Sequence, residues 1–286
     1  MGDLDLDTHV EAVAEDTYRA TLSEDWNIWG PNGGYLAAVL LRAAGAASEP
    51  PRPASLAVQF LGRAAFEPVD LEIRRLRRTR RAEALGVSMR QHGKAIAEAM
   101  AWFVADDVPG LVHDVTTMPD VARPDDLRTW DEIIIVDRGT APPFPFWDNL
   151  EHWPCEWIED WPPPGPGPPR SDTWFRFRPT ATFADPVVDA CRSVVILDTM
   201  GWPATTRAHA WGWPIDGPPP WIAPSLDLHV RFHRAAPGSD VLFCRCDAPV
   251  ADQGLITTEG RLWAADGTLL ASAGSQLLCT PTAPPG

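Results

Sequence analysis

The stretch "APSLDLHVRFHRAA", residues 223–236, alternates apolar and polar side chains without a break. A period of two is typical of a β-strand that buries one face. Earlier in the chain, "PASLAVQFLGRAA" at residues 53–65 gives nearly the same pattern. The recurrence indicates that one structural unit occurs twice in the chain.

Further runs of strand length follow both copies. The first copy is followed by "VDLEIRRLRR", "EALGVSMRQHG" and "KAIAEAMAWFVAD", and the second by "DVLFCRCDAPVA", "LITTEGRLWAADG" and "TLLASAGSQLLCT". A glycine turn joins the last two runs of each set, "QHGK" at 91–94 and "ADGT" at 265–268, as is typical of hairpins. We therefore predict that each half ends in a four-stranded antiparallel meander.

One helix is expected ahead of each meander. Residues 31–47 are apolar nearly all round, with Asn32 as the N-cap, which indicates a helix buried by a surrounding sheet. Residues 185–202 begin with a natural N-cap, Asp185, and end at Gly201. The two helices therefore occupy equivalent places in the two halves.

A strand is expected before each helix, over residues 11–26 and 172–181. A helix wrapped by an antiparallel sheet is the hotdog arrangement, so we predict an α+β chain with two hotdogs in tandem, a double hotdog. The N-terminal hotdog is placed at 1–106 and the C-terminal one, expected to carry the active site, at 171–286. The stretch 107–170 between them is rich in proline and tryptophan and is interpreted as a linker.

Composition excludes several classes of protein. The formal net charge of −15 argues against nucleic-acid binding, which depends on phosphate neutralisation. No apolar run is long enough to predict a membrane span, and the acidic start is unlike a signal peptide. The five cysteines are scattered and lack a second pair with ligand spacing, so we expect no metal site and a reduced, cytoplasmic protein.

The two helices differ in one respect that bears on function. Residues 33–47 contain no carboxylate, whereas Asp198 lies in the apolar run "SVVILDTMG" of the second helix. Burial of a carboxylate is costly unless it is hydrogen-bonded, and it raises the pKa. Asp198 is therefore interpreted either as a structural cap for neighbouring backbone or as a catalytic group.

With these residues the chain resembles the TesB-like acyl-CoA thioesterases, the acyl-CoA thioesterase II family of double hotdogs. The family's catalytic trio is matched here by Asp198 in "VILDTMG", Ser225 in "APSLDLHVRFHR" and Gln276 in "ASAGSQLLCT". The "NGGYLAA" of residues 32–38 resembles the family's glycine-rich entry to the first helix. The resemblance implies an enzyme of lipid metabolism that hydrolyses acyl-CoA to a free acid and coenzyme A, without a cofactor.

The chemistry of these groups suits thioester hydrolysis. Asp198 could act as the general base that activates a water, while Ser225 and Gln276 hold that water by hydrogen bonds. Backbone N–H groups at the helix start, around Gly33 and Gly34, are predicted to bind the substrate and stabilise the oxyanion.

A serine hydrolase with a Ser-His-Asp triad is a weaker hypothesis. No G-x-S-x-G sequence occurs in the chain. His229 and His233 share a strand face with Asp227, but the alternation places that face opposite the core. We interpret it as a solvated or interface face.

Two clusters have both a structural and a functional interpretation. The arginine-rich run 74–81 could anchor the phosphates of coenzyme A, but pairing with acidic side chains is the simpler interpretation. The linker tryptophans could line an acyl tunnel, although packing beneath a long loop is the more usual role. They are Trp147, Trp153, Trp157 and Trp161.

Two other functions stay open at this level. A hotdog could act as an enoyl-thioester hydratase or dehydratase, although neither 31–47 nor 185–202 contains the histidine that such chemistry usually requires. The chain could also bind acyl-CoA without turnover. Edge strands of such sheets commonly pair, so a homo-oligomer, a dimer of double hotdogs, is expected.

Overall fold

The structure is a computed structural model of the chain and describes residues 1–137, 144–156, 165–209 and 220–282. Its first half contains α1 (Leu4–Asp7), β1 (Glu11–Ala14), β2 (Thr17–Thr21), α2 (Gly33–Ala47), β3 (Arg52–Phe60), β4 (Pro68–Arg78), β5 (Ala82–Gln91) and β6 (Lys94–Val104). Its second half contains β7 (Leu150–Pro154), β8 (Arg170–Phe177), α3 (Pro186–Thr199), α4 (Gly201–Arg207), β9 (Trp221–Ile222), β10 (Asp227–Phe232), β11 (Leu242–Asp252), β12 (Leu255–Ala264), β13 (Leu269–Leu278) and β14 (Thr280–Pro281).

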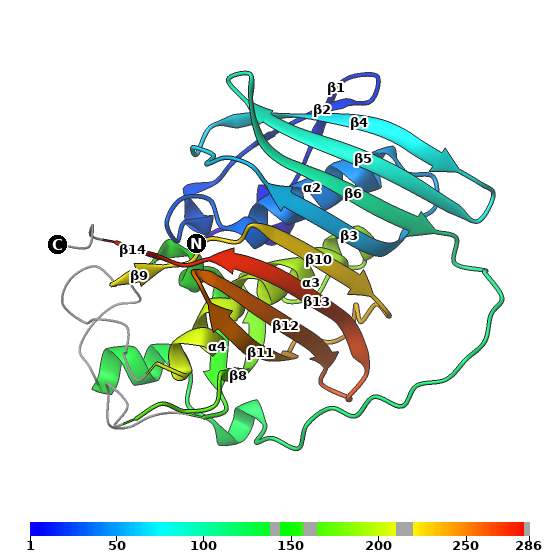
Figure 1. Cartoon of the computed structure of the whole chain (residues 1–286). Helices are drawn as coiled ribbons and strands as arrows, with labels where there is room; N and C mark the ends of the chain where they lie inside the picture. Colours follow the sequence, from blue (N-terminus) through cyan, green and yellow to red (C-terminus); the bar gives the residue numbers. More distant parts are fainter. Residues whose placement is uncertain (138–143, 157–164, 210–219, 283–286) are drawn as a thin grey trace.

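The double hotdog is confirmed. Twelve of the described strands form one sheet in the order β1-β2-β4-β5-β6-β3-β10-β13-β12-β11-β8-β7, and β9 pairs with β14 apart from it. Figure 1 shows α2 and α3 lying against one side of this sheet, with the N-terminal strands at the top and the C-terminal strands below. Each half therefore wraps its own helix.

The predicted order of the strands is wrong at one place in each half. β4, β5 and β6 form a meander, but β3 pairs with β6 instead of β4. In the same way β10 pairs with β13 and not with β11. The first strand thus closes the far side of the meander, which lets the sheet curve around the helix.

The two copies of the repeated strand lie side by side. β3 and β10 pair antiparallel, with Leu228 opposite Val58 and Val230 opposite Leu56. All four side chains are buried in the common core. These two strands join the halves into one sheet, in the centre of Figure 1.

The two long helices pack closely and run in opposite directions. At one end of the contact, a Cβ added to Gly34 would lie 2.8 Å from the Cα of Val195. At the other end, a Cβ added to Gly45 would lie 2.8 Å from the side chain of Val187. Because only glycine allows so close an approach, the start of α2 is fixed beside the end of α3.

The N-cap predictions are confirmed, since the side chain of Asn32 accepts from Tyr35 N and that of Asp185 from Val187 N. The single strand expected over 11–26 is wrong, because a turn at Asp16, with φ of 51°, divides it into β1 and β2.

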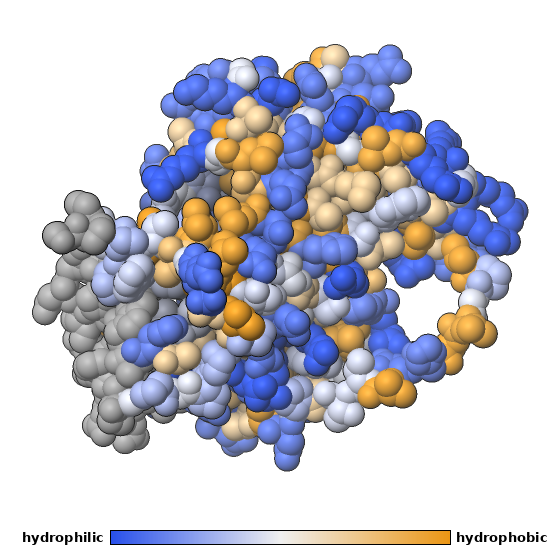
Figure 2. Space-filling view, viewed as in Figure 1, coloured by the Kyte–Doolittle hydropathy of each residue, from blue (hydrophilic) through white to orange (hydrophobic). Residues whose placement is uncertain are grey.

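The interpreted linker 107–170 contributes to the second half of the fold. Its β7 pairs antiparallel with β8, and β8 itself begins at Arg170. The part that follows β6 runs apart from the body, as the ribbon and the space-filling view both show (Figures 1 and 2). Only this first part therefore has the character of a connecting segment.

Among the described residues, no helix is long and apolar enough to cross a membrane. The same residues contain no group of three or more side chains arranged to hold a metal ion. All five cysteines are free, and Cys244 and Cys246 are buried on the inner face of β11.

Candidate active site

Asp198 and Ser225 are brought together from distant parts of the chain. Asp198 lies in the last turn of α3, and Ser225 lies just ahead of β10, where it forms a bridge to Leu277. The Ser225 hydroxyl donates to Oδ1 of Asp198 at 2.9 Å. The structure therefore places these two predicted site residues in direct contact.

The start of α2 covers the other carboxylate oxygen. A Cβ added to Gly33 would lie 2.8 Å from Oδ2 of Asp198, so the helix backbone reaches the carboxylate because Gly33 has no side chain. Burial raises the pKa of Asp198 to about 6, while the Ser225 hydroxyl and the Gly34 backbone N–H oppose that rise. The carboxyl group is thus poised to exchange a proton near neutral pH.

A second contact fixes the two helix ends against each other. Asn32 caps α2 with its side-chain oxygen, and its Nδ2 donates to the hydroxyl of Thr199 at 3.2 Å. That hydroxyl in turn donates to Val195 O, within α3. The residue next to Asp198 is therefore tied to the N-cap of the opposite helix.

These groups open into a cavity of about 620 Å³. Asp198, Ser225 and Gly33 line it together with largely apolar walls, which include Trp29, Phe60, Trp147 and Trp202. Trp29 and Trp202 come from different halves and form an edge-to-face pair with ring centroids 6.2 Å apart. The second half supplies Asp198 and Ser225, and the first half supplies Gly33 and one wall of the cavity.

Gln276 lies apart from this pair. Along β13 the side chains of Ser275 and Leu277 are buried on the inner face, whereas Gln276 lies on the outer one. Its Nε2 donates to the hydroxyl of Thr257, directly opposite on β12, and it does not line the cavity. The structure thus brings together two members of the predicted trio and not the third.

His152 is a titratable cavity residue that the sequence did not indicate. His152, on β7, is 6% exposed and lines the cavity, where its ring lies 4.8 Å from Trp147 and 5.8 Å from Phe175, centroid to centroid. Burial lowers the pKa of His152 to about 3, so the ring is neutral. Its place within the Pro- and Trp-rich stretch gave no signal for this position.

The outer-face interpretation of the histidines agrees with the structure. His229 is exposed on β10, and His233 pairs with the Ser272 hydroxyl at 3.0 Å. Neither lines the cavity. The hydroxyl of Ser225 is bonded to Asp198 instead, so no Ser-His-Asp triad forms among the described residues.

None of the six arginines of 74–81 lines the cavity, and three of them pair with acids, as the simpler interpretation expects. Arg78 contacts Glu49, and Arg75 contacts Asp16 at 3.5 Å. Of the linker tryptophans, Trp147 lines the cavity and Trp153 packs in a separate cluster. Trp157 and Trp161 lie outside the described residues.

Gly33→Ala should lower kcat by about tenfold or more while the protein stays folded. The new methyl group would fall 2.8 Å from Oδ2 of Asp198, and a shift of the carboxylate misaligns the base. Steady-state kinetics and circular dichroism check this expectation. Gly238→Ala is the control, because Gly238 is exposed, has open space for a Cβ and does not line the cavity. An unchanged kcat in Gly33→Ala would show that carboxylate placement is not limiting.

Comparison with known proteins agrees with this architecture. A sequence profile of the acyl-CoA thioesterase N-terminal domain matches residues 22–104, and one of the C-terminal domain matches residues 112–278. A comparison with curated protein sequences gave no match.

Solved structures with the same fold cover nearly the whole chain. They include a hot dog fold protein from Alicyclobacillus acidocaldarius, with 21% identity, a TM-score of 0.79 and 98% of each chain covered. The acyl-CoA thioesterase II TesB2 from Mycobacterium marinum has 22% identity and a TM-score of 0.77, covering 98% of this chain and 99% of its own. The tesB protein of Mycobacterium avium subs paratuberculosis has 21% identity and a TM-score of 0.76, with 97% and 98% covered.

The fold and the two matched domains define a thioester hydrolase. The chain belongs to the acyl-CoA thioesterase family and is TesB-like.

Proposed function

We propose that the protein hydrolyses acyl-CoA to a free carboxylic acid and coenzyme A, with Asp198 as the general base that activates water. The observation that supports this most is the carboxylate itself, which lines an apolar cavity, is hydrogen-bonded to Ser225, and has a pKa raised to about 6. A base with a pKa near the working pH is the most effective at taking a proton from water.

In the proposed reaction, water gives a proton to Asp198 as its oxygen attacks the thioester carbonyl. The negative charge that develops on the carbonyl oxygen needs a donor, and the N–H of Gly33, in the first turn of α2, is our candidate because Gly33 lines the cavity. The thiolate of coenzyme A then leaves and takes up the proton that Asp198 received from water, which returns Asp198 to its ionised form. The Gly34 N–H is directed at Asp198, so we assign it to holding the base.

The first experiment is an assay of the pure protein with a series of acyl-CoA esters, following the released thiol with a chromogenic disulfide reagent. Thiol release with saturation kinetics supports the proposal. Tight binding without release would contradict it and favour an acyl-CoA-binding protein.

One observation favours the hydratase alternative, because the cavity contains a histidine, His152. His152 is held between aromatic rings and is not hydrogen-bonded to Asp198. Water addition to an enoyl-CoA would be seen as loss of its conjugated ultraviolet absorbance without thiol release. We expect thiol release instead.

The contribution of the other two predicted residues can be separated. Ser225→Ala should lower kcat about 10- to 100-fold. It should also move the acidic limb of the pH profile to higher pH, because the hydrogen bond from Ser225 lowers the pKa of Asp198 and its loss raises that pKa. Gln276→Ala should keep kcat within about threefold, because its side chain lies on the outer face of β13. Kinetics of both variants on one acyl-CoA measure this. Loss of activity in Gln276→Ala equal to that in Ser225→Ala would restore Gln276 to the catalytic trio.

A further inference from the structure

One arginine at the cavity differs from the others in forming no ion pair with a described acidic residue. Arg63, in the loop between β3 and β4, lines the cavity and is exposed to solvent, so it lies at the opening. It forms no ion pair or hydrogen bond with any residue that the structure describes. By contrast, Arg170 and Arg207, which also line the cavity, are paired with Asp247 at 2.7 Å and Glu156 at 2.9 Å.

The backbone on both sides of Arg63 is fixed. Before it, the N–H groups of Leu61 and Gly62 both donate to Ile96 O, at 2.8 and 3.1 Å. After it, the buried side chain of Gln91 accepts from Ala65 N at 2.7 Å and donates to Ala65 O at 3.0 Å. The guanidinium group is therefore presented from a short loop that is held at each end.

The loop leaves the sheet beside the reacting groups. Phe60 N donates to Leu226 O at 2.9 Å, and Leu226 follows Ser225. Arg63 is three residues beyond Phe60, a span of at most about 10 Å. A molecule whose thioester reaches Ser225 and Asp198 through this opening would pass the guanidinium group.

The positive charge of Arg63 at the opening favours binding of an anionic substrate. The chain carries a formal net charge of −15, which repels an anion in solution, so an anionic substrate needs a local cation at the entrance. A guanidinium fork matches the geometry of phosphate oxygens, and an arginine without an acidic partner has its donors available.

We propose that Arg63 binds a phosphate group of coenzyme A at the cavity opening and thereby favours coenzyme A thioesters over thioesters of uncharged thiols. This inference rests on the proposed function, and it assigns the contact to Arg63 and not to the run 74–81. No covalent step is involved. Arg63 acts in binding alone.

The test compares two substrates with the same acyl group, the coenzyme A ester and the phosphate-free N-acetylcysteamine ester. Arg63→Ala should raise KM for the coenzyme A ester about tenfold and leave kcat within twofold. Its KM for the N-acetylcysteamine ester should stay within twofold. The rise of KM for the coenzyme A ester with ionic strength should also be weaker in the variant.

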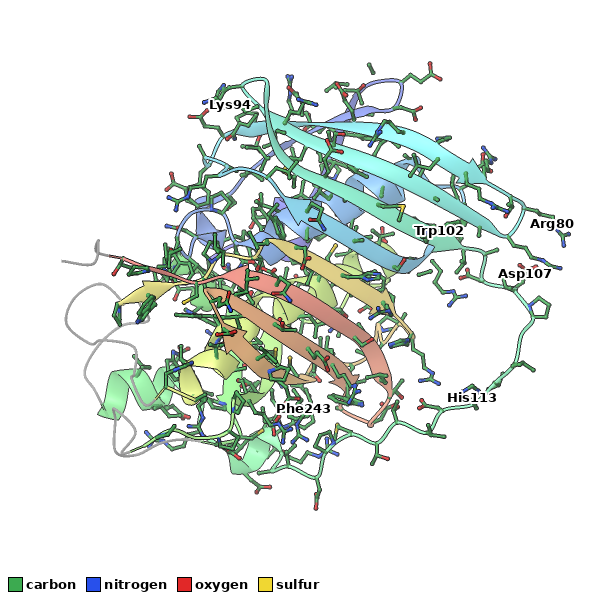
Figure 3. All side chains as sticks on the ribbon, in the orientation of Figure 1. Arg80, Lys94, Trp102, Asp107, His113 and Phe243 are labelled. Carbon is green, nitrogen blue, oxygen red and sulfur yellow. The ribbon has the colours of Figure 1, made fainter. Side chains whose placement is uncertain are left out.

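Arg80→Ala is the matched control, because Arg80 is an exposed arginine at the tip of the β4–β5 hairpin and does not line the cavity. It lies at the right of the view, whereas β9, whose Ile222 lines the cavity, lies at the left (Figures 1 and 3). Arg80→Ala should leave all these constants unchanged. An equal rise of KM for both substrates in Arg63→Ala, or no rise for either, would overturn the proposal.

The experiments distinguish a failure of this inference from a failure of the proposed function. If the wild-type protein hydrolyses neither ester, the proposed function fails. Calorimetric titration with coenzyme A then decides the role of Arg63. A Kd about tenfold weaker in Arg63→Ala than in wild type and Arg80→Ala supports it, and an unchanged Kd contradicts it.

Discussion

Asp198→Asn should lower kcat for acyl-CoA hydrolysis by about 100- to 10,000-fold, the usual contribution of a general base. The asparagine keeps the size of the side chain and can still accept the hydrogen bond from Ser225, so the cavity keeps its shape. What is lost is the capacity to take a proton from water. Thiol release under saturating substrate measures the effect.

Asp70→Asn is the control, since Asp70 lies on β4 outside the cavity, with 53% of its side chain exposed. Its kcat should equal that of wild type. A folded Asp198→Asn protein that retains more than a tenth of the wild-type kcat would contradict the base assignment, and direct attack by another group would then have to be considered.

The second large effect is a pH-dependent gain in stability for Asp198→Asn. Burial raises the pKa of Asp198 from its usual 3.8 to about 6, so the folded state holds this proton more tightly than the unfolded state. Wild-type stability therefore decreases as pH rises from about 4 to about 6, by roughly 3 kcal/mol from this group. Asparagine does not titrate, so the variant lacks this loss.

Urea unfolding of both proteins between pH 4 and pH 8 measures the difference in free energy of unfolding, in which the other titrating groups cancel. The difference should grow in favour of the variant by roughly 3 kcal/mol and level off above about pH 7. A difference that is constant with pH would mean that the carboxyl group ionises in the folded protein as it does in the unfolded chain.

The same ionisation should appear in the kinetics. Since the ionised form of Asp198 is the base, kcat/KM of the wild type should fall tenfold per pH unit below about pH 6 and be level above pH 7. A phosphate-free thioester is the appropriate substrate, because the phosphates of coenzyme A titrate in the same range. The agreement of the kinetic and stability midpoints would assign both to Asp198.

The sequence determined the features that depend on near neighbours. The hairpin turns at Gly93 and Gly267, both with positive φ, follow from short glycine sequences, and the N-caps of α2 and α3 follow from Asn32 and Asp185. Each of these acts over a few residues through its own backbone geometry or hydrogen bonds.

The position of Gln276 outside the cavity could have been predicted from the sequence. In "ASAGSQLLCT" the inward face is given by the alternation that includes Leu277, and Gln276 falls one residue out of step with it. A shift of one residue moves a side chain to the other face of the sheet. The family resemblance named Gln276 as a catalytic residue, although this alternation places its side chain on the outer face.

Only the tertiary structure decided which distant segments meet. The pairing of β3 with β10 and the antiparallel contact of α2 with α3 put Gly33 against Asp198, and they leave Arg63 at the cavity opening. Strand partners and helix crossings are fixed by burying the largest apolar surface for the whole chain at once. Local sequence does not record that choice: it indicated a buried carboxylate at Asp198, whereas the contacts of Ser225 and Gly34 with that carboxylate are made by the tertiary structure.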